Sequence, residues 1–304
     1  MIDINDPRVA YIEETHKKQL LVYWSLGNTC TYACSYCPSR LHDGSVPYQS
    51  VEIIKRTLDK FPVSQVIFTG GEPTYHPEFE RIVAEAPEHI RVDVISNASR
   101  PIAFWERIVD RFTMVMLTFH AEYADTDRFF KTAELVYLKS HRRGAVNLTM
   151  IPAHWDKCVA AYERFTDAGI TVTAKPLIDN FGNESESLIS HYSNEQVEWI
   201  KQRTNENSSK NLAFYNNKNE LIYKTTPAEM LVNKQTNFKG WTCYTPTQYL
   251  YINPEGNVYN TSCKQREQVG NIYTDFTFTD KPTICEQNFC WCFTDIQTKK
   301  IKNV

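Results

Sequence analysis

The sequence has no surplus of basic residues and no basic patch. It contains 33 lysines and arginines against 36 aspartates and glutamates, for a formal net charge of −3, and the basic residues are spread along the chain. Because a domain that binds a nucleic-acid backbone carries a clustered positive surface, we expect no nucleic-acid partner.

Long apolar runs and targeting signals are absent as well. No apolar run approaches the length of about 20 residues that spans a bilayer. The N-terminal segment lacks the basic flank and apolar stretch of a signal peptide. We therefore expect a cytoplasmic protein with no membrane partner. Repeats of solenoid period and low-complexity tracts are also missing, which excludes a repeat architecture.

Nine cysteines stand out against these absences. In a reducing compartment, cysteines are more often metal ligands or buried apolar residues than disulfides, so their grouping decides their role. Cys158 stands alone on a predicted helix, where we interpret it as a packed or exposed thiol far from the sheet mouth. The other eight form one group of three and one of five.

The 304 residues, 42% of them hydrophobic, suffice for one large domain with an appendage. Short β-rich runs alternate with segments of helical period, which predicts an α/β fold with a parallel sheet, either an open barrel or a doubly wound sheet. Both geometries bind ligands at the carboxyl ends of the strands. The predicted strands cover 20–27, 65–71, 91–99, 113–120, 145–152 and 171–179, and the predicted helices 51–61, 78–86, 101–112, 127–140 and 154–169.

The alternating pattern stops near residue 180. We expect one helix and an Asn- and Lys-rich connection over 181–240, followed by a small C-terminal unit over 241–304. This unit contains "QYLYINPEGNVYNTSC", two β-rich runs around a turn, which predicts a hairpin. With an N-terminal extension over 1–19, the main α/β domain then covers 20–180.

Cys30, Cys34 and Cys37 directly follow the first predicted strand, where the ligand-binding face of such a sheet begins. Buried cysteines on one helix face would explain the spacing, but Gly27 and Pro38 argue against a continuous helix.

Two metal sites fit the same three thiols. A closed zinc site needs a fourth ligand, for which His42 is the nearest candidate. An iron–sulfur cluster held by three thiolates instead leaves one iron open for a substrate or cofactor.

Two motifs resemble those of one enzyme superfamily. The CxxxCxxC spacing in "NTCTYACSYCPSR", with Tyr36 just before the last cysteine, is similar to the cluster motif of the radical SAM enzymes. The second predicted strand ends in "TGGEP", which is similar to that family's GGE motif. The resemblance covers about residues 20–180 and implies a partial (βα)6 barrel, in agreement with the six predicted strands.

The resemblance implies a cofactor and a reaction. Cys30, Cys34 and Cys37 would hold a [4Fe–4S] cluster whose open iron chelates S-adenosylmethionine (SAM). An external reductant such as flavodoxin or ferredoxin would reduce this cluster, and reductive cleavage would yield a 5′-deoxyadenosyl radical that abstracts a substrate hydrogen. No catalytic residue beyond the cluster is assigned.

Candidate cofactor or substrate contacts lie at or near the strand ends. The two glycines of "TGGEP" would let the backbone approach the methionine part of SAM, and the glutamate region would accept from its ammonium. A histidine at a strand end is more often structural, so His120 carries both interpretations. The full set is Tyr36, Gly70, Gly71, Glu72, Ser96, Asn97, Thr118, His120, Asn147 and Lys175.

The five C-terminal cysteines resemble the twitch or SPASM-type extension of radical SAM enzymes, which carries auxiliary iron–sulfur clusters. Four thiolates close one [4Fe–4S] cluster, so five cysteines leave one in excess. Zinc bound to the same thiolates is the alternative. The first-choice ligands are Cys243, Cys263, Cys290 and Cys292, with Cys285 as the alternative ligand.

An auxiliary cluster favours oxidation or cross-linking over simple isomerisation. The resemblance thus implies a radical SAM oxidoreductase that oxidises, cross-links or epimerises a ribosomally made peptide. A second hypothesis is a dehydrogenase or dehydratase of a sugar-like or nucleotide-like small molecule, because we expect no N-terminal leader-recognition domain before the first strand. A third is a non-catalytic zinc- or cluster-binding module.

Overall fold

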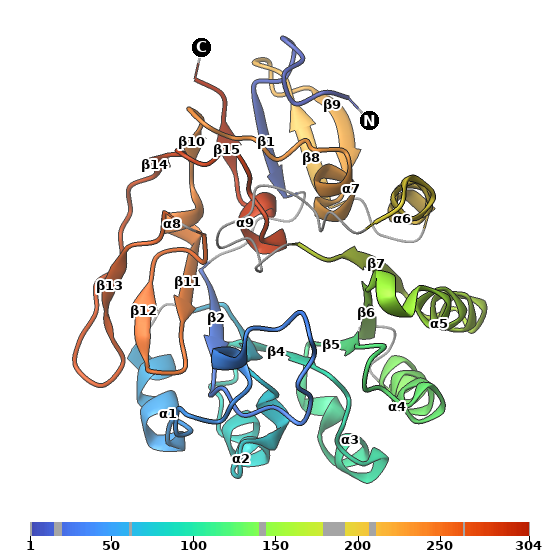
Figure 1. Cartoon of the computed structure of the whole chain (residues 1–304). Helices are drawn as coiled ribbons and strands as arrows, with labels where there is room; N and C mark the ends of the chain where they lie inside the picture. The colour runs from blue at the N-terminus through green and yellow to red at the C-terminus, as the bar shows by residue number, and fades with distance from the viewer. Residues whose placement is uncertain are drawn as a thin grey trace.

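The computed structural model describes residues 2–14, 20–60, 63–139, 144–178, 192–206, 211–263 and 265–303. Two sheets organise these residues. The larger sheet has the order β13-β12-β11-β2-β3-β4-β5-β6-β7, and the smaller has the order β14-β10-β15-β1-β8-β9. Figure 1 shows the larger sheet curving below the smaller one.

The six predicted strands form the parallel part of the larger sheet, as predicted. They are β2 (Leu21–Ser25), β3 (Gln65–Thr69), β4 (Arg91–Ser96), β5 (Met114–Phe119), β6 (Gly144–Met150) and β7 (Val172–Pro176). The strand order is linear, so the strands make a partial barrel that stays open. This confirms the predicted fold class.

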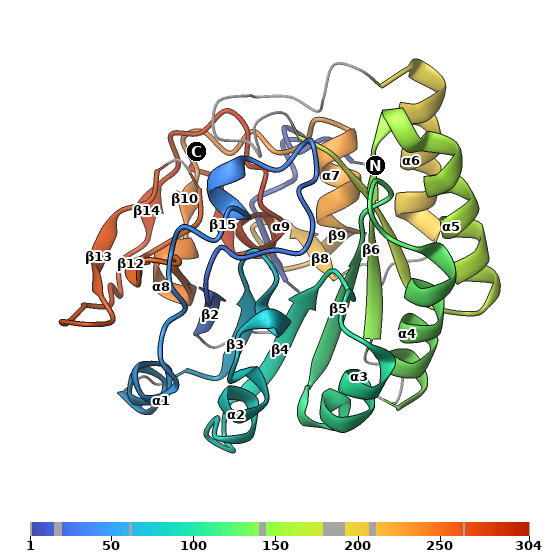
Figure 2. The same cartoon turned by 60° about the horizontal axis from the view of Figure 1, so that its bottom comes forward.

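The predicted helices follow these strands and cover the outer face of the partial barrel, as Figure 2 shows. Four short 3-10 turns accompany them: η1 (Ser39–Leu41), η2 (Pro73–Tyr75), η3 (Val109–Arg111) and η4 (Pro152–His154). The helices are α1 (Val51–Lys60), α2 (Phe79–Ala84), α3 (Ile102–Ile108), α4 (Thr126–Lys139) and α5 (Trp155–Asp167).

Side-chain alternation separates the two faces of the barrel strands. Leu117 and Leu148 lie in the core between sheet and helices. Their neighbours Thr118 and Asn147 are paired across β5 and β6 and are only partly buried. The inner face of the barrel therefore carries polar groups that remain accessible.

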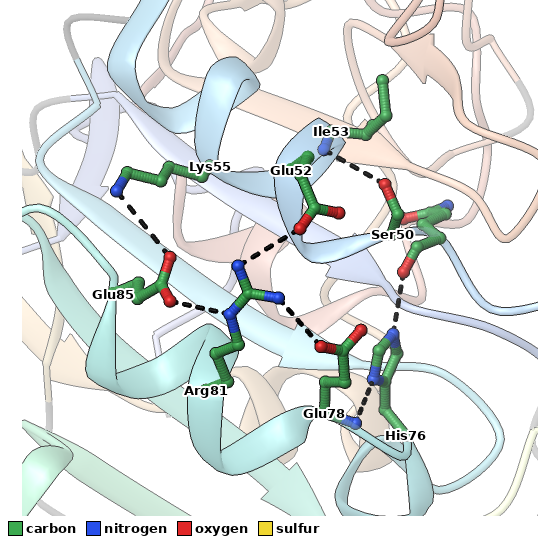
Figure 3. Close-up of polar contacts among 9 residues, drawn as sticks. Ser50, Glu52, Ile53, Lys55, His76, Glu78, Arg81 and Glu85 are labelled. Atoms are coloured by element: carbon green, nitrogen blue, oxygen red, sulfur yellow. Dashed lines mark hydrogen bonds and ion pairs between the residues drawn. The ribbon is translucent and has the colours of Figure 1, made fainter.

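A polar network links the first two barrel helices. Arg81 on α2 forms ion pairs with Glu52 on α1 at 3.1 Å and with Glu78 and Glu85 at 2.9 and 2.7 Å. Figure 3 shows this network, together with the contact of the His76 ring to the backbone of Gln49 at 2.8 Å. The network fixes α1 and α2 relative to each other beneath the segment that follows β3.

The predicted C-terminal hairpin is present, but it extends the barrel sheet. β11 (Tyr249–Ile252) pairs in parallel with β2, and β12 (Asn257–Tyr259) and β13 (Gln268–Asn271) follow in antiparallel pairing. Gly256 adopts φ +82° in the connecting turn, a conformation that favours glycine. The C-terminal unit therefore shares a sheet with the main domain.

The smaller sheet joins distant parts of the chain. β1 (Tyr11–Glu14) lies between β8 (Leu212–Tyr215) and β15 (Lys300–Ile301). The remaining strands of this sheet are β9 (Leu221–Thr225), β10 (Thr242–Cys243) and β14 (Thr283–Ile284). The expected N-terminal extension thus contributes a central strand.

The expected helix after residue 180 is α6 (Asn194–Glu206), but the connection after it differs from the expectation. Two short apolar runs flank its Asn-rich centre and pair as β8 and β9, with Asn219 at φ +62° in the turn. Residues 179–191 and 207–210 of the expected connection lie outside the described residues. The remaining helices are α7 (Pro227–Val232), α8 (Thr245–Gln248) and α9 (Phe293–Gln297).

Each sheet has its own apolar core. The core of the smaller sheet includes Ile12, Phe214 and Phe238 and also three cysteines of the C-terminal group. Among the described residues, no helix combines the length and apolar character that a bilayer crossing requires.

Candidate active site at the barrel mouth

The loop that follows β2 carries the three predicted cluster cysteines. The Cys37 N–H donates to the Cys34 carbonyl at 2.9 Å, which closes a turn between these residues. The Cys30 sulfur accepts from the Tyr32 N–H at 3.4 Å and from the Asn97 side-chain amide at 3.7 Å. All three thiols are free of disulfide bonds. We call residues Gly27 to Cys37 the cysteine loop.

Burial raises the pKa of each thiol in the cysteine loop, to about 12 for Cys34 and about 11 for Cys37. The proximity of Cys30 raises the pKa of both further, because like charges would lie close together. A bound metal removes this cost, since the thiolate is the form that ligates metal. The thiols therefore suit a shared metal centre.

The spacing of these thiols bears on the choice between zinc and an iron–sulfur cluster. Among the described residues, no three His, Cys, Asp or Glu side chains lie close enough to surround one ion. A polynuclear cluster accepts a wider spacing, because each thiolate binds a different iron. His42, the candidate fourth zinc ligand, has its Nε2 3.2 Å from the Cys37 carbonyl oxygen. His42 therefore contacts the backbone of the cysteine loop.

The glycine pair after β3 packs against the backbone of the cysteine loop. The Gly71 N–H donates to the Gly27 carbonyl at 3.0 Å, and the Glu72 N–H donates to the Thr29 carbonyl at 2.8 Å. A Cβ on Gly71 would lie 2.4 Å from the Thr29 carbonyl oxygen, and one on Gly70, at φ +141°, would lie 2.4 Å from the Gly27 carbonyl oxygen. This backbone contact by itself requires glycine at both positions.

The Glu72 carboxylate is buried and accepts several protein hydrogen bonds. It accepts from the Thr74 hydroxyl at 2.6 Å, the Ser96 hydroxyl at 2.8 Å and the Asn97 N–H at 2.6 Å. Desolvation raises its pKa, and these hydrogen bonds oppose the rise. Glu72 therefore joins the ends of β3 and β4, and places Ser96 and Asn97 beside the cysteine loop.

The loop after β5 holds the other side of the cysteine loop. The Ser35 N–H donates to the Glu122 carboxylate at 2.7 Å, and the Ser35 hydroxyl also donates to it. The Tyr123 hydroxyl donates to the Ala33 carbonyl at 3.0 Å, and its ring stacks on Tyr32 at 5.3 Å. Sequence analysis missed Glu122 and Tyr123; their place just after a strand end was the one available signal.

Two predicted contact residues meet at this point. The Tyr36 hydroxyl lies 2.5 Å from Nδ1 of His120, and the two rings stack. Burial, and to a smaller extent the nearby Lys175 ammonium, lower the His120 pKa to about 4. His120 is therefore a neutral imidazole at physiological pH, paired with the residue before the last cysteine of the loop.

The inner face of the barrel brings the remaining candidates toward the same mouth. Thr118 and Asn147 lie side by side on β5 and β6, and the Asn147 amide is 2.6 Å from the Met116 sulfur. The Lys175 ammonium lies 5.3 Å from the centre of the Phe293 ring on α9. Desolvation lowers the Lys175 pKa. Thr118, Asn147 and Lys175 thus lie on the same face of three neighbouring strands.

Four of the five C-terminal thiols are grouped by their electrostatic contacts. The Cys243 thiol is close enough to raise the pKa of three other thiols, those of Cys263, Cys285 and Cys290. A cavity of about 240 Å³ opens beside Cys243 and Cys285. We call Cys243, Cys263, Cys285 and Cys290 the second thiol group.

Cys292 lies at the N-terminal end of α9. Its electrostatic neighbours include Tyr23, Tyr249 and Lys175 at the barrel mouth. Cys292 shares a neighbour with the second thiol group, because the Asp295 carboxylate raises the pKa of Cys263, Cys285, Cys290 and Cys292. Which four of the five C-terminal cysteines bind a cluster stays a prediction.

A buried lysine adjoins the second thiol group. Lys300 has 0% exposed surface, and its ammonium donates to the carbonyls of Asp295, Ile296 and Thr298 near the end of α9. Its positive charge lowers the pKa of the Cys285 and Cys290 thiols, against the larger effect of burial. A fixed cation beside four thiols favours their thiolate form, which suits a metal centre.

Cys158 has no part in either thiol group. It is fully buried on α5, and its sulfur lies 3.5 Å from the Thr149 carbonyl oxygen. The structure thus places it in the core between helix and sheet.

Comparison with known proteins agrees with this geometry. Residues 24–189, more than half of the chain, match the radical SAM superfamily. The chain belongs to the radical SAM superfamily. Members of this superfamily are enzymes that use SAM and a [4Fe–4S] cluster for reductive cleavage of SAM, with electrons from an external reductant.

Individual relatives are more distant. A segment of 112 residues is 29% identical to a probable GTP 3′,8-cyclase of Methanocella arvoryzae, and it covers 34% of this chain and 35% of that protein. The match thus spans about a third of that relative's length.

Two solved structures share the fold over 85% of the chain. One is anSMEcpe with bound AdoMet and Cp18Cys peptide, at 16% identity, a TM-score of 0.53 and 78% coverage of that chain. The other is SuiB of Streptococcus suis, at 14% identity, a TM-score of 0.53 and 64% coverage of that chain. These likenesses establish a common radical SAM fold beyond the matched domain.

We predict that Gly71→Ala prevents formation of the first cluster in this radical SAM enzyme. The added Cβ would meet the Thr29 carbonyl at 2.4 Å, so the cysteine loop must move. Overpacking of this kind costs about 1–3 kcal/mol. Iron content after anaerobic reconstitution measures cluster formation. Denaturant unfolding of the apoprotein measures the loss of stability. Gly169→Ala is the control, because nothing lies within 4 Å of its Cβ and only the backbone strain at φ +75° applies. Full iron content and wild-type stability in Gly71→Ala would contradict the prediction.

We also predict that Glu122→Ala makes the first cluster labile. The variant removes the acceptor for Ser35, which lies between two cluster cysteines, while the global stability falls by only about 1–2 kcal/mol. The rate at which a chelator bleaches the cluster absorbance measures lability. Glu134→Ala, at an exposed position on α4, is the matched control. Equal bleaching rates in the two variants would count against a positioning role for Glu122.

Proposed function

We propose that the protein is a radical SAM enzyme with one auxiliary [4Fe–4S] cluster that oxidises, cross-links or epimerises a ribosomally made peptide. The observation that carries this proposal is the second thiol group at the side of the barrel mouth. A [4Fe–4S] cluster needs cysteine thiols that lie near one another. Four thiols between positions 243 and 290 are linked by electrostatic contacts.

The first site would be built from the cysteine loop. Cys30, Cys34 and Cys37 would ligate three irons of the cluster and leave the fourth for SAM, whose cleavage then supplies the radical. The donors on the Cys30 sulfur, from Tyr32 and Asn97, would stabilise its negative charge and raise the reduction potential.

The residues around this cluster would bind and orient SAM and the substrate. Gly70 and Gly71 keep the backbone close to the cysteine loop, and the Glu72 side chain is occupied by protein donors. A contact of Glu72 with the SAM ammonium would therefore use its backbone. Thr118 and Asn147 on the inner face would contact the substrate or the ribose.

The second site would be built from the second thiol group, in a single-cluster extension of the twitch type. Cys243, Cys263, Cys285 and Cys290 would close this cluster, and Lys300 would balance part of its negative charge. An auxiliary cluster can accept the electron left on a substrate radical or bind a substrate group. This role supports oxidation or cross-linking.

Peptide chemistry draws support from the solved structures of similar fold, one of which holds a peptide. A small open reading frame encoded beside this gene provides the test, by anaerobic co-expression and mass spectrometry of the encoded peptide. Loss of two hydrogens would indicate oxidation or cross-linking, and deuterium uptake from D₂O would indicate epimerisation. An unmodified peptide alongside active SAM cleavage would count against this substrate class.

A nucleotide-like or sugar-like substrate is the second candidate. The partial match to a probable GTP 3′,8-cyclase and the Lys175 cation on the inner face of the barrel favour it. Anaerobic incubation with GTP, followed by chromatography of the nucleotide, separates this candidate from the peptide.

We predict that Cys34→Ala abolishes 5′-deoxyadenosine formation while the fold survives. The variant removes one of three ligands and leaves the first cluster without a stable attachment. Chromatography after reduction with dithionite measures the product, and circular dichroism checks the fold. Cys158→Ala, a change of similar size in the core, should retain the activity. Turnover in Cys34→Ala would overturn the assignment of the first cluster.

We predict opposite results for two neighbouring cysteines of the C-terminal region. The wild type should contain about eight irons per chain, as two [4Fe–4S] clusters require. Cys285→Ala should fall toward about four, and Cys292→Ala should stay near eight. Iron and sulfide quantitation after reconstitution measures this difference. The reverse pattern would restore the ligand set expected from the sequence, and a wild type with about four irons would remove the auxiliary cluster.

A further inference from the structure

We propose that Lys175 binds an acidic group of the substrate, a carboxylate or a phosphate, inside the barrel mouth. This inference rests on the proposed function, because it takes the inner face of the barrel as the surface that binds substrate. It adds a chemical requirement that the proposed function leaves open: the substrate carries a negative charge near the reacting position.

Lys175 lies between the cysteine-loop side of the barrel mouth and α9. Lys175 lies on the inner face of β7, next to Thr149 on β6, and Thr149 is within hydrogen-bonding reach of the Tyr36 hydroxyl. On the other side, its ammonium faces the Phe293 ring at the start of α9. Figure 1 shows α9 beside the end of β7, in the space between the two sheets. A ligand held by Lys175 would lie between the cysteine loop and α9.

The Lys175 ammonium has no acidic partner in the part of the chain that the structure describes. Its neighbours are an aromatic ring, the neutral His120 imidazole and the Cys292 thiol. Holding a partly buried ammonium without a counter-ion is costly, and an anion that enters the site offsets that cost. The site therefore selects for a negatively charged group.

Two other inward-pointing lysines show what a structural role looks like in this fold. The Lys300 ammonium donates to three backbone carbonyls, and the Lys157 ammonium donates to the carbonyls of Ala121 and Ala124 at 2.7 and 2.8 Å. Both satisfy their hydrogen bonds within the protein. Lys175 differs from them because its surroundings supply a ring face and neutral side chains.

The neighbouring polar groups suit an acidic ligand group. Thr118, Asn147 and Thr173 are paired across β5, β6 and β7 and form one row on the inner face. Their hydroxyl and amide groups can donate to oxygens of a carboxylate or phosphate that Lys175 holds. The row and the ammonium together make a compact polar surface opposite the cysteine loop.

SAM also carries a carboxylate, so the source of the anion must be tested. In the proposed first site that carboxylate binds the open iron, which leaves Lys175 for the substrate. Two measurements distinguish the SAM carboxylate from an acidic substrate group. One is the affinity of the enzyme for SAM, and the other is the binding of added anions to the SAM-loaded enzyme.

The experiment compares reconstituted wild type with Lys175→Met, Lys175→Arg and the surface control Lys224→Met. SAM affinity is measured by calorimetry. Thermal unfolding of the SAM-loaded enzymes is then measured with acetate, inorganic phosphate or pyrophosphate, with sodium chloride added to hold the ionic strength constant. Without added anions, Lys175→Met should unfold at a higher temperature than wild type, because an uncompensated, partly buried charge is removed.

We expect phosphate or pyrophosphate to raise the unfolding temperature of wild type, Lys175→Arg and Lys224→Met, and to leave Lys175→Met unchanged. SAM affinity should change less than twofold in all variants. Equal anion effects in wild type and Lys175→Met, or no effect in wild type, would overturn the proposal. A tenfold loss of SAM affinity in Lys175→Met would assign the lysine to the cofactor and also overturn it. Failure of the proposed function would show separately, as absence of 5′-deoxyadenosine from wild type.

Discussion

The site depends on the close backbone contact between the segment after β3 and the cysteine loop after β2. Gly71 and Glu72 donate to the carbonyls of Gly27 and Thr29, at a distance that leaves no room for a Cβ. The Glu72 side chain then connects this contact to β4 through Ser96 and Asn97. One short segment therefore holds three strand ends together and determines where the thiols point.

The second constraint is that the ends of the chain build one sheet. β1 and β15 pair with each other, and β10 brings Cys243 next to β14, which precedes Cys285. Three members of the second thiol group, Cys243, Cys285 and Cys290, consequently lie in the core of the smaller sheet, Cys263 is partly buried, and Lys300 supplies a buried positive charge. Meanwhile β11 pairs with β2, so the same C-terminal region is attached to the strand that leads into the cysteine loop. This arrangement gives the two thiol groups fixed positions around a common mouth.

Charge is distributed unevenly around that mouth. The cysteine loop and the second thiol group would both become negative when they hold iron–sulfur clusters, while the inner face between them carries a cation and neutral polar groups. Such a surface can attract an acidic substrate and hold it away from either cluster. The neutral His120 and its bond to Tyr36 add a rigid wall on the side of the cysteine loop.

The sequence by itself determined the barrel and the first thiol group. Alternating apolar runs specify six strands with helices outside, and three cysteines within one loop stay together in any fold of that loop. Only the tertiary structure decided that residues 212–225 form two strands beside β1, that Glu122 supports the cysteine loop, and that Cys243, Cys285 and Cys290 lie in one core. These outcomes depend on strand pairing between distant segments and on the direction of single side chains, and neither is encoded in local spacing.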